Sequence, residues 1–257
     1  MTDTTCTILL VVEGNSDARR LPVLIDAWIG ASVDWATLDT FRAYRHVLGH
    51  DALDDETPPY LPIKDIPRLA RDSFGGFRGD FSGGGDQGLL RKLEQLLIRW
   101  GWSKRPDAAV VWGRDTDQSP GRRAEAADAR ERLLAKGPGT PHLLRAVAEP
   151  CGEAWVLLGW LPADTAESAR HARLVNHLGF DPVLHPTRTS SKGTGQAPAP
   201  SKDIVAELTS GSADREVECL CRAAGLDDQR TEASGLADLK RDVSTWMSHL
   251  TGASGSL

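Results

Sequence analysis

A short, uninterrupted run of aliphatic residues near the N-terminus constrains the fold of this 257-residue chain most strongly. Residues 7–12 read TILLVV, a pattern typical of a strand that is buried on both faces. The turn EGNSD follows, and residues 17–30 then have the pattern of a helix with Ser16 or Asp17 as its N-cap. A helix directly after a buried strand predicts a parallel β–α unit. We therefore expect an α/β fold with a central, mainly parallel sheet flanked by helices.

Further segments repeat this order of strand and helix. The other predicted strands are residues 107–112 and 142–150, with a weaker pattern at 33–41, and the predicted helices are 88–100, 122–136, 151–161, 201–224 and 233–250. The predicted helix at 122–136 is followed by Gly137 and Pro138, a pair that commonly ends a helix.

The composition along the chain predicts its organisation. Residues 1–162 form the expected α/β core, and 163–257 form a C-terminal helical annex. Residues from about 45 to 87 are rich in Gly, Pro and Asp, so we expect an insertion with little regular structure of its own. A Pro-, Ser- and Gly-rich loop is expected at about 185–200.

Composition also limits the classes of function. No apolar run approaches the roughly 20 residues that a membrane helix needs, and no basic region precedes the N-terminal apolar run. We therefore expect a cytoplasmic protein without a membrane partner. The net charge of −6 argues against tight, non-specific binding of nucleic acid by this chain alone. It is compatible with an enzyme that uses acidic metal ligands and that relies on a partner protein for part of its affinity for nucleic acid.

Acidic residues follow three of the predicted strands. Glu13 comes directly after the first strand, Asp115 and Asp117 follow the second, and Glu153 follows the third, with Glu149 as an alternative to it. The carboxyl ends of parallel strands meet at one edge of a sheet, where open α/β folds build their sites. Because Mg²⁺ prefers oxygen ligands and keeps several waters, a few carboxylates at this edge suffice to bind it.

Each of these acids also has a purely structural interpretation. Asp17 alone is equally well explained as a helix N-cap, and Glu153 as a first-turn residue that complements the helix dipole. An Asp-x-Asp pair after a strand also occurs in ordinary surface loops. The joint placement of the acids at one predicted edge favours the metal site.

The segments VVEGNSD, VVWGRDTD and EPCGEAW together resemble the Toprim domain over roughly residues 7–160. This Rossmann-like domain occurs in topoisomerases, primases, OLD-family nucleases and small stand-alone bacterial proteins, and the GEAW element is most similar to the last group. The resemblance implies that Glu13 is a general acid/base and that Asp115 and Asp117 bind metal. In the OLD-like branch it further implies that Asp17 and Glu153 are metal ligands.

The OLD-like nucleases also use a lysine near the charge that develops on the phosphoryl oxygens. Lys202 is the candidate here and Lys192 the alternative, although an ordinary solvated lysine explains either position. The chain departs from the family pattern at Ser119, where a third acid of a DxDxD motif would fall. It also carries no ATPase domain, so an ATPase would have to be a separate subunit.

These observations predict a nuclease that uses Mg²⁺, or alternatively Mn²⁺, to cleave DNA or RNA in anti-phage defence or DNA repair. A non-catalytic or partner-dependent Toprim-like subunit is the first alternative, favoured by the acidic charge and the missing third acid. A small-molecule phosphohydrolase with Asp115 as nucleophile is the second. That alternative leaves the Val-Glu-Gly segment at Glu13 unexplained.

Overall fold

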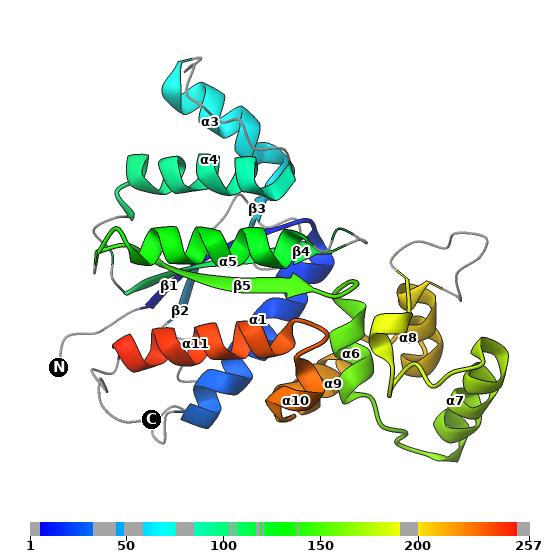
Figure 1. Cartoon of the computed structure of the whole chain (residues 1–257). Coiled ribbons are helices and arrows are strands. Elements are labelled where there is room, and N and C mark those ends of the chain that lie inside the picture. Colours follow the sequence, from blue (N-terminus) through cyan, green and yellow to red (C-terminus); the bar gives the residue numbers. More distant parts are fainter. Residues whose placement is uncertain are drawn as a thin grey trace.

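A computed structural model gives the arrangement of the chain (Figure 1). The structure describes residues 6–32, 45–48, 59–75, 85–102, 105, 107–116, 119, 121–137, 139–190 and 200–250. The predicted strand at 33–41, together with Asp117 and Lys192, lies outside these residues.

A parallel sheet forms the centre of the fold, which confirms the predicted α/β class. Its strands are β1 (Cys6–Val12), β2 (Arg45–Leu48), β3 (Leu61–Pro62), β4 (Ala108–Asp115) and β5 (His142–Ala148). The order is β2-β1-β4-β5, and every pair is parallel. The short β3 also pairs with β1, at Val11 and Val12, beyond the segment that pairs with β2.

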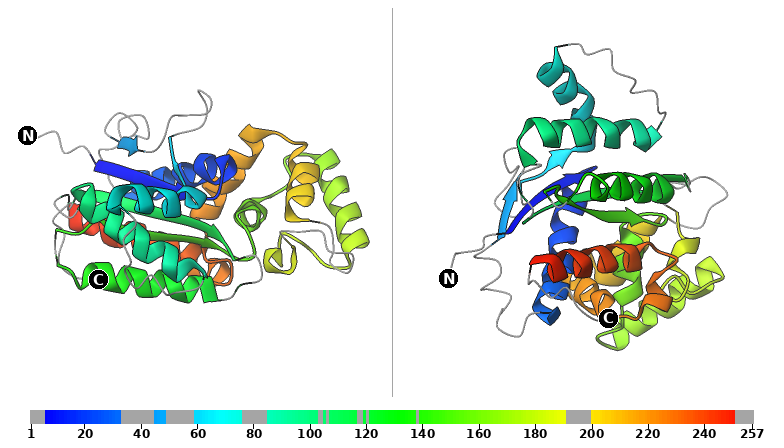
Figure 2. Two further views of the ribbon diagram at one scale, coloured as in Figure 1. Left: turned by 90° about the horizontal axis from the view of Figure 1, so that it is seen from above. Right: turned by 60° about the vertical axis from the view of Figure 1, so that its left-hand side comes forward.

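Alternate residues of the strands feed two separate hydrophobic clusters, as the two-residue period of a strand requires. Ile8, Leu10 and Val12 of β1 point into one cluster, whereas Leu9 and Val11 point into the other. The first cluster packs against α1 (Asn15–Ser32), α6 (Glu153–Gly159) and α11 (Leu236–Leu250). The second packs against α3 (Ile66–Phe74), α4 (Gly85–Arg99) and α5 (Gly121–Leu134), so helices cover both faces (Figure 2).

The C-terminal region is helical, as predicted. It contains α7 (Thr165–Leu178), α8 (Ser201–Thr209), α9 (Ala213–Ala224), α10 (Asp228–Thr231) and α11, with a short 3-10 turn at Pro186–Arg188. Helix α7 had no counterpart among the predicted segments. In Figure 1, α7 and α8 lie beyond the carboxyl ends of the strands, whereas α11 runs beneath the sheet. The first hydrophobic cluster extends from Ile8 to Met247, so it includes residues from both sides of the predicted boundary at 162.

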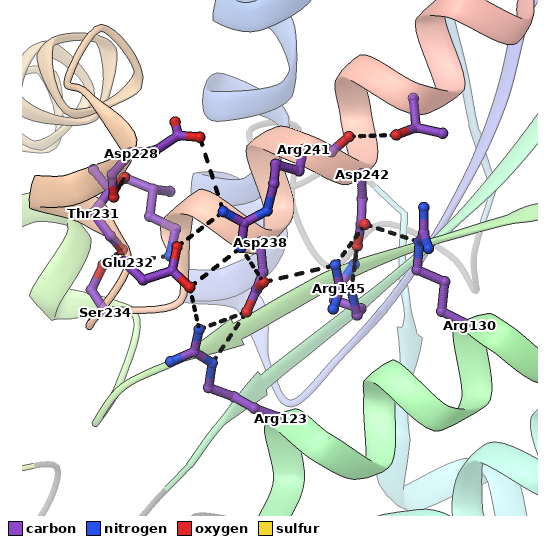
Figure 3. A network of polar contacts seen from close by, with 12 residues as sticks. Arg123, Arg130, Arg145, Asp228, Thr231, Glu232, Ser234, Asp238, Arg241 and Asp242 are labelled. Carbon is purple, nitrogen blue, oxygen red and sulfur yellow. Dashed lines mark hydrogen bonds and ion pairs between the residues drawn. The ribbon is translucent and has the colours of Figure 1, made fainter.

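Helix α11 is tied to the edge strand β5 by a buried carboxylate (Figure 3). The Asp242 side chain is 1% exposed and accepts hydrogen bonds from the backbone amide, Nε and Nη2 of Arg145 at 2.7–2.9 Å. Arg130 of α5 approaches the same carboxylate at 2.9 Å. An edge strand leaves backbone donors unpaired, and Asp242 satisfies one of them from outside the sheet.

Two sequence predictions need correction. Residues 45–87 were expected to have little regular structure, but they contain β2, β3, the 3-10 turn Ile63–Asp65 and α3, and they contribute two strands to the sheet. Helix α1 begins at Asn15, and Ala18 donates to the carbonyl of Gly14, so neither Ser16 nor Asp17 is its N-cap. Among the described residues, no helix combines the length and hydropathy needed to cross a membrane.

Candidate functional site

A small pocket opens at the carboxyl edge of the sheet, where β4 and β5 end against the first turns of α1 and α6. Two acidic residues, Asp17 and Asp115, and two arginines, Arg20 and Arg114, are among the residues that line it. Gly113, Ala146, Ala148, Gly152, Leu21 and Trp155 form the remaining wall. The pocket therefore combines acidic and basic groups on a largely apolar base at the edge where the sequence predicted a site.

The side chains of Val12 and Leu21 pack closely against Gly113 in the wall of this pocket. A Cβ atom on Gly113 would lie 2.7 Å from Cγ1 of Val12 and 2.8 Å from Cδ1 of Leu21. Both distances are below normal van der Waals contact, so an added side chain would force the Val12 and Leu21 side chains to shift. Leu21 of α1 thus packs directly over Gly113 of β4, two residues before Asp115.

Asp115 is held in place by the loop after β5. The backbone amide of Gly152 donates to its Oδ1 over 2.9 Å, and Nη1 of Arg122 donates to its backbone carbonyl. Burial, followed by the charges of Asp17, Glu153 and Glu13, raises the pKa of Asp115 to about 8, although the Gly152 hydrogen bond opposes this. The carboxyl group therefore keeps its proton at neutral pH unless a cation compensates its charge.

Asp17 has a related environment. Burial raises its pKa to about 6, and Glu13 and Glu153 add to the effect, while Arg20 and a hydrogen bond from the backbone of Gly14 act in the opposite direction. At the third position of α1, Asp17 thus interacts with the amide that precedes the helix, as acidic residues of the first turn commonly do. Asp17 therefore both stabilises the start of α1 and lines the pocket.

Glu153 lies in the first turn of α6, as predicted, but its carboxylate forms an ion pair with Arg20. Nη1 of Arg20 contacts Oε1 of Glu153 at 2.8 Å, and Nη2 of Arg20 contacts Glu216 of α9 at 3.0 Å. Burial acts to raise the pKa of Glu153, but the charge and hydrogen bond of Arg20 outweigh it and lower the pKa overall. Arg20 therefore connects the pocket to the C-terminal helices.

Glu13 lies directly after β1 and pairs with Arg114, whose Nη1 is 2.6 Å from Oε1 of Glu13. The Glu13 side chain remains 32% exposed, which leaves it accessible from solvent. Nε of Arg114 also donates to both carboxylate oxygens of Asp86, at 3.1 and 3.2 Å. Because neighbouring strand residues point to opposite faces, Arg114 lies on the α4 side and Asp115 on the α1 side of β4.

The structure thus brings Glu13, Asp17, Asp115 and Glu153 to one edge, where the charges of Glu13 and Glu153 raise the pKa of both aspartates. The part of the chain that is described contains no group of three or more His, Cys, Asp or Glu side chains arranged to hold a metal ion. Asp117 lies outside that part. Of the two alternatives Glu149 and Glu153, Glu153 is tied to the pocket, because its charge raises the pKa of both Asp17 and Asp115.

Lys202 lies in the first turn of α8 and is exposed. Its neighbour Ser201 forms a side-chain hydrogen bond with Cys151, which in turn contacts Glu153. The start of α8 is therefore near the loop that carries Glu153, but among the described residues no hydrogen bond or ion pair joins Lys202 to the carboxylates. The role of this lysine stays a prediction.

Sequence reasoning did not identify Arg20, Arg114 or Asp86 as site residues. Arg20 follows Asp17 by three residues in a predicted helix, a spacing that places the two side chains on one face. Arg114 directly precedes Asp115, so its closeness to the site could be inferred from the chain alone. Asp86 lies in the Gly-rich segment and offered no comparable signal.

Comparisons with protein-family models, with curated proteins and with solved structures return no match to this chain. The resemblance to the Toprim domain therefore stays a prediction that rests on the motifs themselves.

Proposed function

We propose that this chain is a metal-dependent phosphodiester hydrolase that acts on nucleic acid, with Asp17 and Asp115 as its central ligands for Mg²⁺ or Mn²⁺. The observation that carries the proposal is the raised pKa of both carboxyl groups, to about 6 and about 8, inside one pocket at the carboxyl edge of the sheet. Burial, together with the neighbouring acids, disfavours the ionised form of both carboxyl groups, and a bound cation would favour it. Such pKa shifts are common at functional sites.

The pocket fits a hard divalent cation in its chemistry. Its acidic ligands are carboxylate oxygens, and a cation beside them would relieve the repulsion among Asp17, Asp115, Glu13 and Glu153. The two nearest glutamates are engaged by Arg20 and Arg114, so the described residues offer two central ligands rather than a complete cage. Mg²⁺ usually keeps several waters and takes oxygens from its substrate, which makes so few protein ligands sufficient.

When bound, such an ion supplies a water of lowered pKa and neutralises charge on the leaving oxygen. The chain's own residues have distinct parts in this proposal. Glu13, partly exposed beside the pocket, accepts a proton from the attacking water. Gly152 holds the Asp115 carboxylate in position through its amide, and Arg20 holds Glu153 at the pocket's edge.

Cleavage assays on the purified full chain test this function. Plasmid DNA, single-stranded DNA and total RNA would be incubated with wild type, Asp115→Asn and Glu13→Gln in Mg²⁺, Mn²⁺ or EDTA. We expect metal-dependent cleavage by the wild type and a loss of roughly 100-fold or more in each variant, since Glu13→Gln removes the proton acceptor and Asp115→Asn removes a charged metal ligand. Asp72→Asn, which removes an exposed partner of Arg68 at 3.5 Å, is the control and should cleave normally. Unchanged cleavage in both site variants would disprove the mechanism.

A partner-dependent or non-catalytic subunit is the alternative that a specific observation favours. The described residues contain no three-ligand metal group, and the chain is acidic overall. This alternative predicts no turnover on any of the three substrates by the isolated chain. The phosphohydrolase alternative, with Asp115 as nucleophile, is less well supported, because it gives no part to Glu13, which directly follows β1 and acts on the pKa of Asp115.

A further inference from the structure

A buried acid on the opposite face of β4 organises two arginines beside the pocket. The side chain of Asp86, in the first turn of α4, is 2% exposed. It accepts both hydrogen bonds from Nε of Arg114, and Nε of Arg122 lies 3.7 Å from its Oδ2. A buried carboxylate is costly unless it is paired, so these two guanidinium groups are firmly held.

The contacts of Arg114 leave one side of its guanidinium available to a ligand. Nε donates to Asp86 and Nη1 contacts Glu13, while no hydrogen bond from Nη2 is found within the described residues. The side chain is 18% exposed, and Arg114 is one of the residues that line the pocket with Asp17 and Asp115. A guanidinium group that is fixed on one side and open on the other suits a phosphate oxygen, because its donors are planar and permanently charged.

Glu94 shows that a buried acid with two cations does not by itself form a site. Further along α4, its side chain is 8% exposed and pairs with Arg132 at 2.7 Å and Lys136 at 3.0 Å. These partners lie at and just beyond the C-terminal end of α5, and none of the three lines the pocket. What distinguishes Arg114 is therefore its position between a buried anchor and the proposed reaction site.

We propose that Arg114 binds a backbone phosphate of the nucleic-acid substrate at the mouth of this pocket, and that Asp86 is the positioning residue that holds Arg114 there. This inference rests on the proposed function for its choice of ligand. A phosphate bound at Nη2 lies next to the Glu13 carboxylate on Nη1, so the two anions compete for the positive charge of one guanidinium group. The surface that recognises substrate thus lies on the α4 side of β4, and the carboxylates Asp17 and Asp115 lie on the α1 side.

Binding measured without cleavage tests this assignment. The anisotropy of a short fluorescein-labelled single-stranded DNA would be titrated with the full chain, in EDTA and in Ca²⁺, at several salt concentrations. We expect Arg114→Gln to weaken binding about tenfold, as loss of one charge-assisted contact does, and to reduce the salt slope by about one. Arg114→Lys should recover part of the affinity, and Asp86→Asn should lose part of it. Glu13→Gln should bind more tightly in EDTA, because it removes the competing anion.

Arg132→Gln and Glu94→Gln are the matched controls, since they break a similar buried pair between α4 and α5. They should lose stability comparable to that lost by the Arg114 and Asp86 variants, and bind with unchanged affinity and salt slope. Unchanged affinity in a folded Arg114→Gln variant overturns the inference, and so does a wild type that binds no oligonucleotide in either buffer. A wild type that binds through Arg114 but never cleaves supports this inference and disproves the hydrolase. Cleavage that is lost in Asp115→Asn but unchanged in Arg114→Gln supports the hydrolase and overturns the assignment of Arg114 as a phosphate-binding residue.

Discussion

The backbone amide of Gly152 donates a hydrogen bond to Oδ1 of Asp115 over 2.9 Å, so the loop after β5 fixes the acid that ends β4. Asparagine at position 115 would keep an oxygen for this hydrogen bond and remove the ionisable group. The hydrogen bond and the charge at this position can therefore be separated in one experiment.

Asp115→Asn should change how stability depends on pH. The pKa of Asp115 is raised from 3.8 to about 8, so the folded protein binds more protons than the unfolded chain between these values. The wild type accordingly loses stability as the pH rises through this range, and the variant lacks that loss. In EDTA, we expect the two to be similar near pH 4, with the variant more stable at pH 9 by on the order of a few kcal/mol. Urea unfolding followed by circular dichroism measures this difference. A constant difference across the range would contradict the raised pKa.

The sheet could be predicted from sequence where its strands are long and buried on both faces. β1 and the first part of β4 are continuous apolar runs, and β5 is mostly apolar apart from His142 and Arg145, as helices on both faces of a parallel sheet require. β2 has only four residues, with a charged residue and a histidine among them, so no local pattern marks it. Its pairing with β1 depends on contacts between distant parts of the chain.

Helix α3 carried a signal that the surrounding composition concealed. It begins just before Pro67, a position that proline tolerates, and ends at Gly75 with a φ of 63°. Ile66 and Ala70 are buried at a helical spacing. The many glycines and prolines around this segment led to the prediction of a loop, whereas Pro67 and Gly75 are the start and stop signals of a helix.

The sequence predicted the acidic residues of the candidate site but not its arginines. Acids after parallel strands must meet at one edge, so Glu13 and Asp115 could be placed from strand order alone. The partners of Arg20 and Arg114 come from α9 and α4, which are distant in sequence. No local pattern specifies such pairs, because they follow from how helices pack on the two faces of the sheet.

Removal of the Asp242 carboxylate should destabilise the fold strongly. Asp242 is almost fully buried and satisfies Arg145, including its backbone amide, together with Arg130 (Figure 3). Asp242→Ala leaves two guanidinium groups without their buried partner, which typically costs about 3–5 kcal/mol of the free energy of unfolding. Asp228→Ala, at the exposed end of the same network, should cost about 1 kcal/mol or less. Chemical denaturation of both variants measures the contrast, and equal losses would contradict the importance of burial here.

Gly159 should tolerate no side chain, because α6 and α9 touch there. A Cβ atom would lie 1.9 Å from the carbonyl oxygen of Cys219 and 2.6 Å from the amide nitrogen of Ala223. Both atoms belong to the backbone of α9, so the helix as a whole must move. We expect Gly159→Ala to lower the free energy of unfolding by about 3 kcal/mol, at the upper end for overpacking. Gly121→Ala is the control, because a Cβ atom there meets nothing within 4 Å. Thermal melts that show no difference between the two variants would refute the close contact.

His142 should make the protein less stable in mild acid, opposite in sign to the effect of Asp115. It begins β5, and its ring centroid lies 5.0 Å from that of His249 on α11. Burial, followed by the charges of His249 and Arg130, lowers the pKa of His142 from 6.5 to about 4. The unfolded chain therefore binds more protons than the folded protein between these values, and stability falls as the pH drops from 6.5 to 4. His142→Gln should remove this contribution, so the urea midpoints of wild type and variant should move apart between pH 7 and pH 4.5, with the wild type losing more.

His249→Gln should reduce the contribution in part, since it removes one of the charges that act on His142. Parallel midpoints for wild type and His142→Gln over this range would show that His142 titrates alike in the folded and unfolded states.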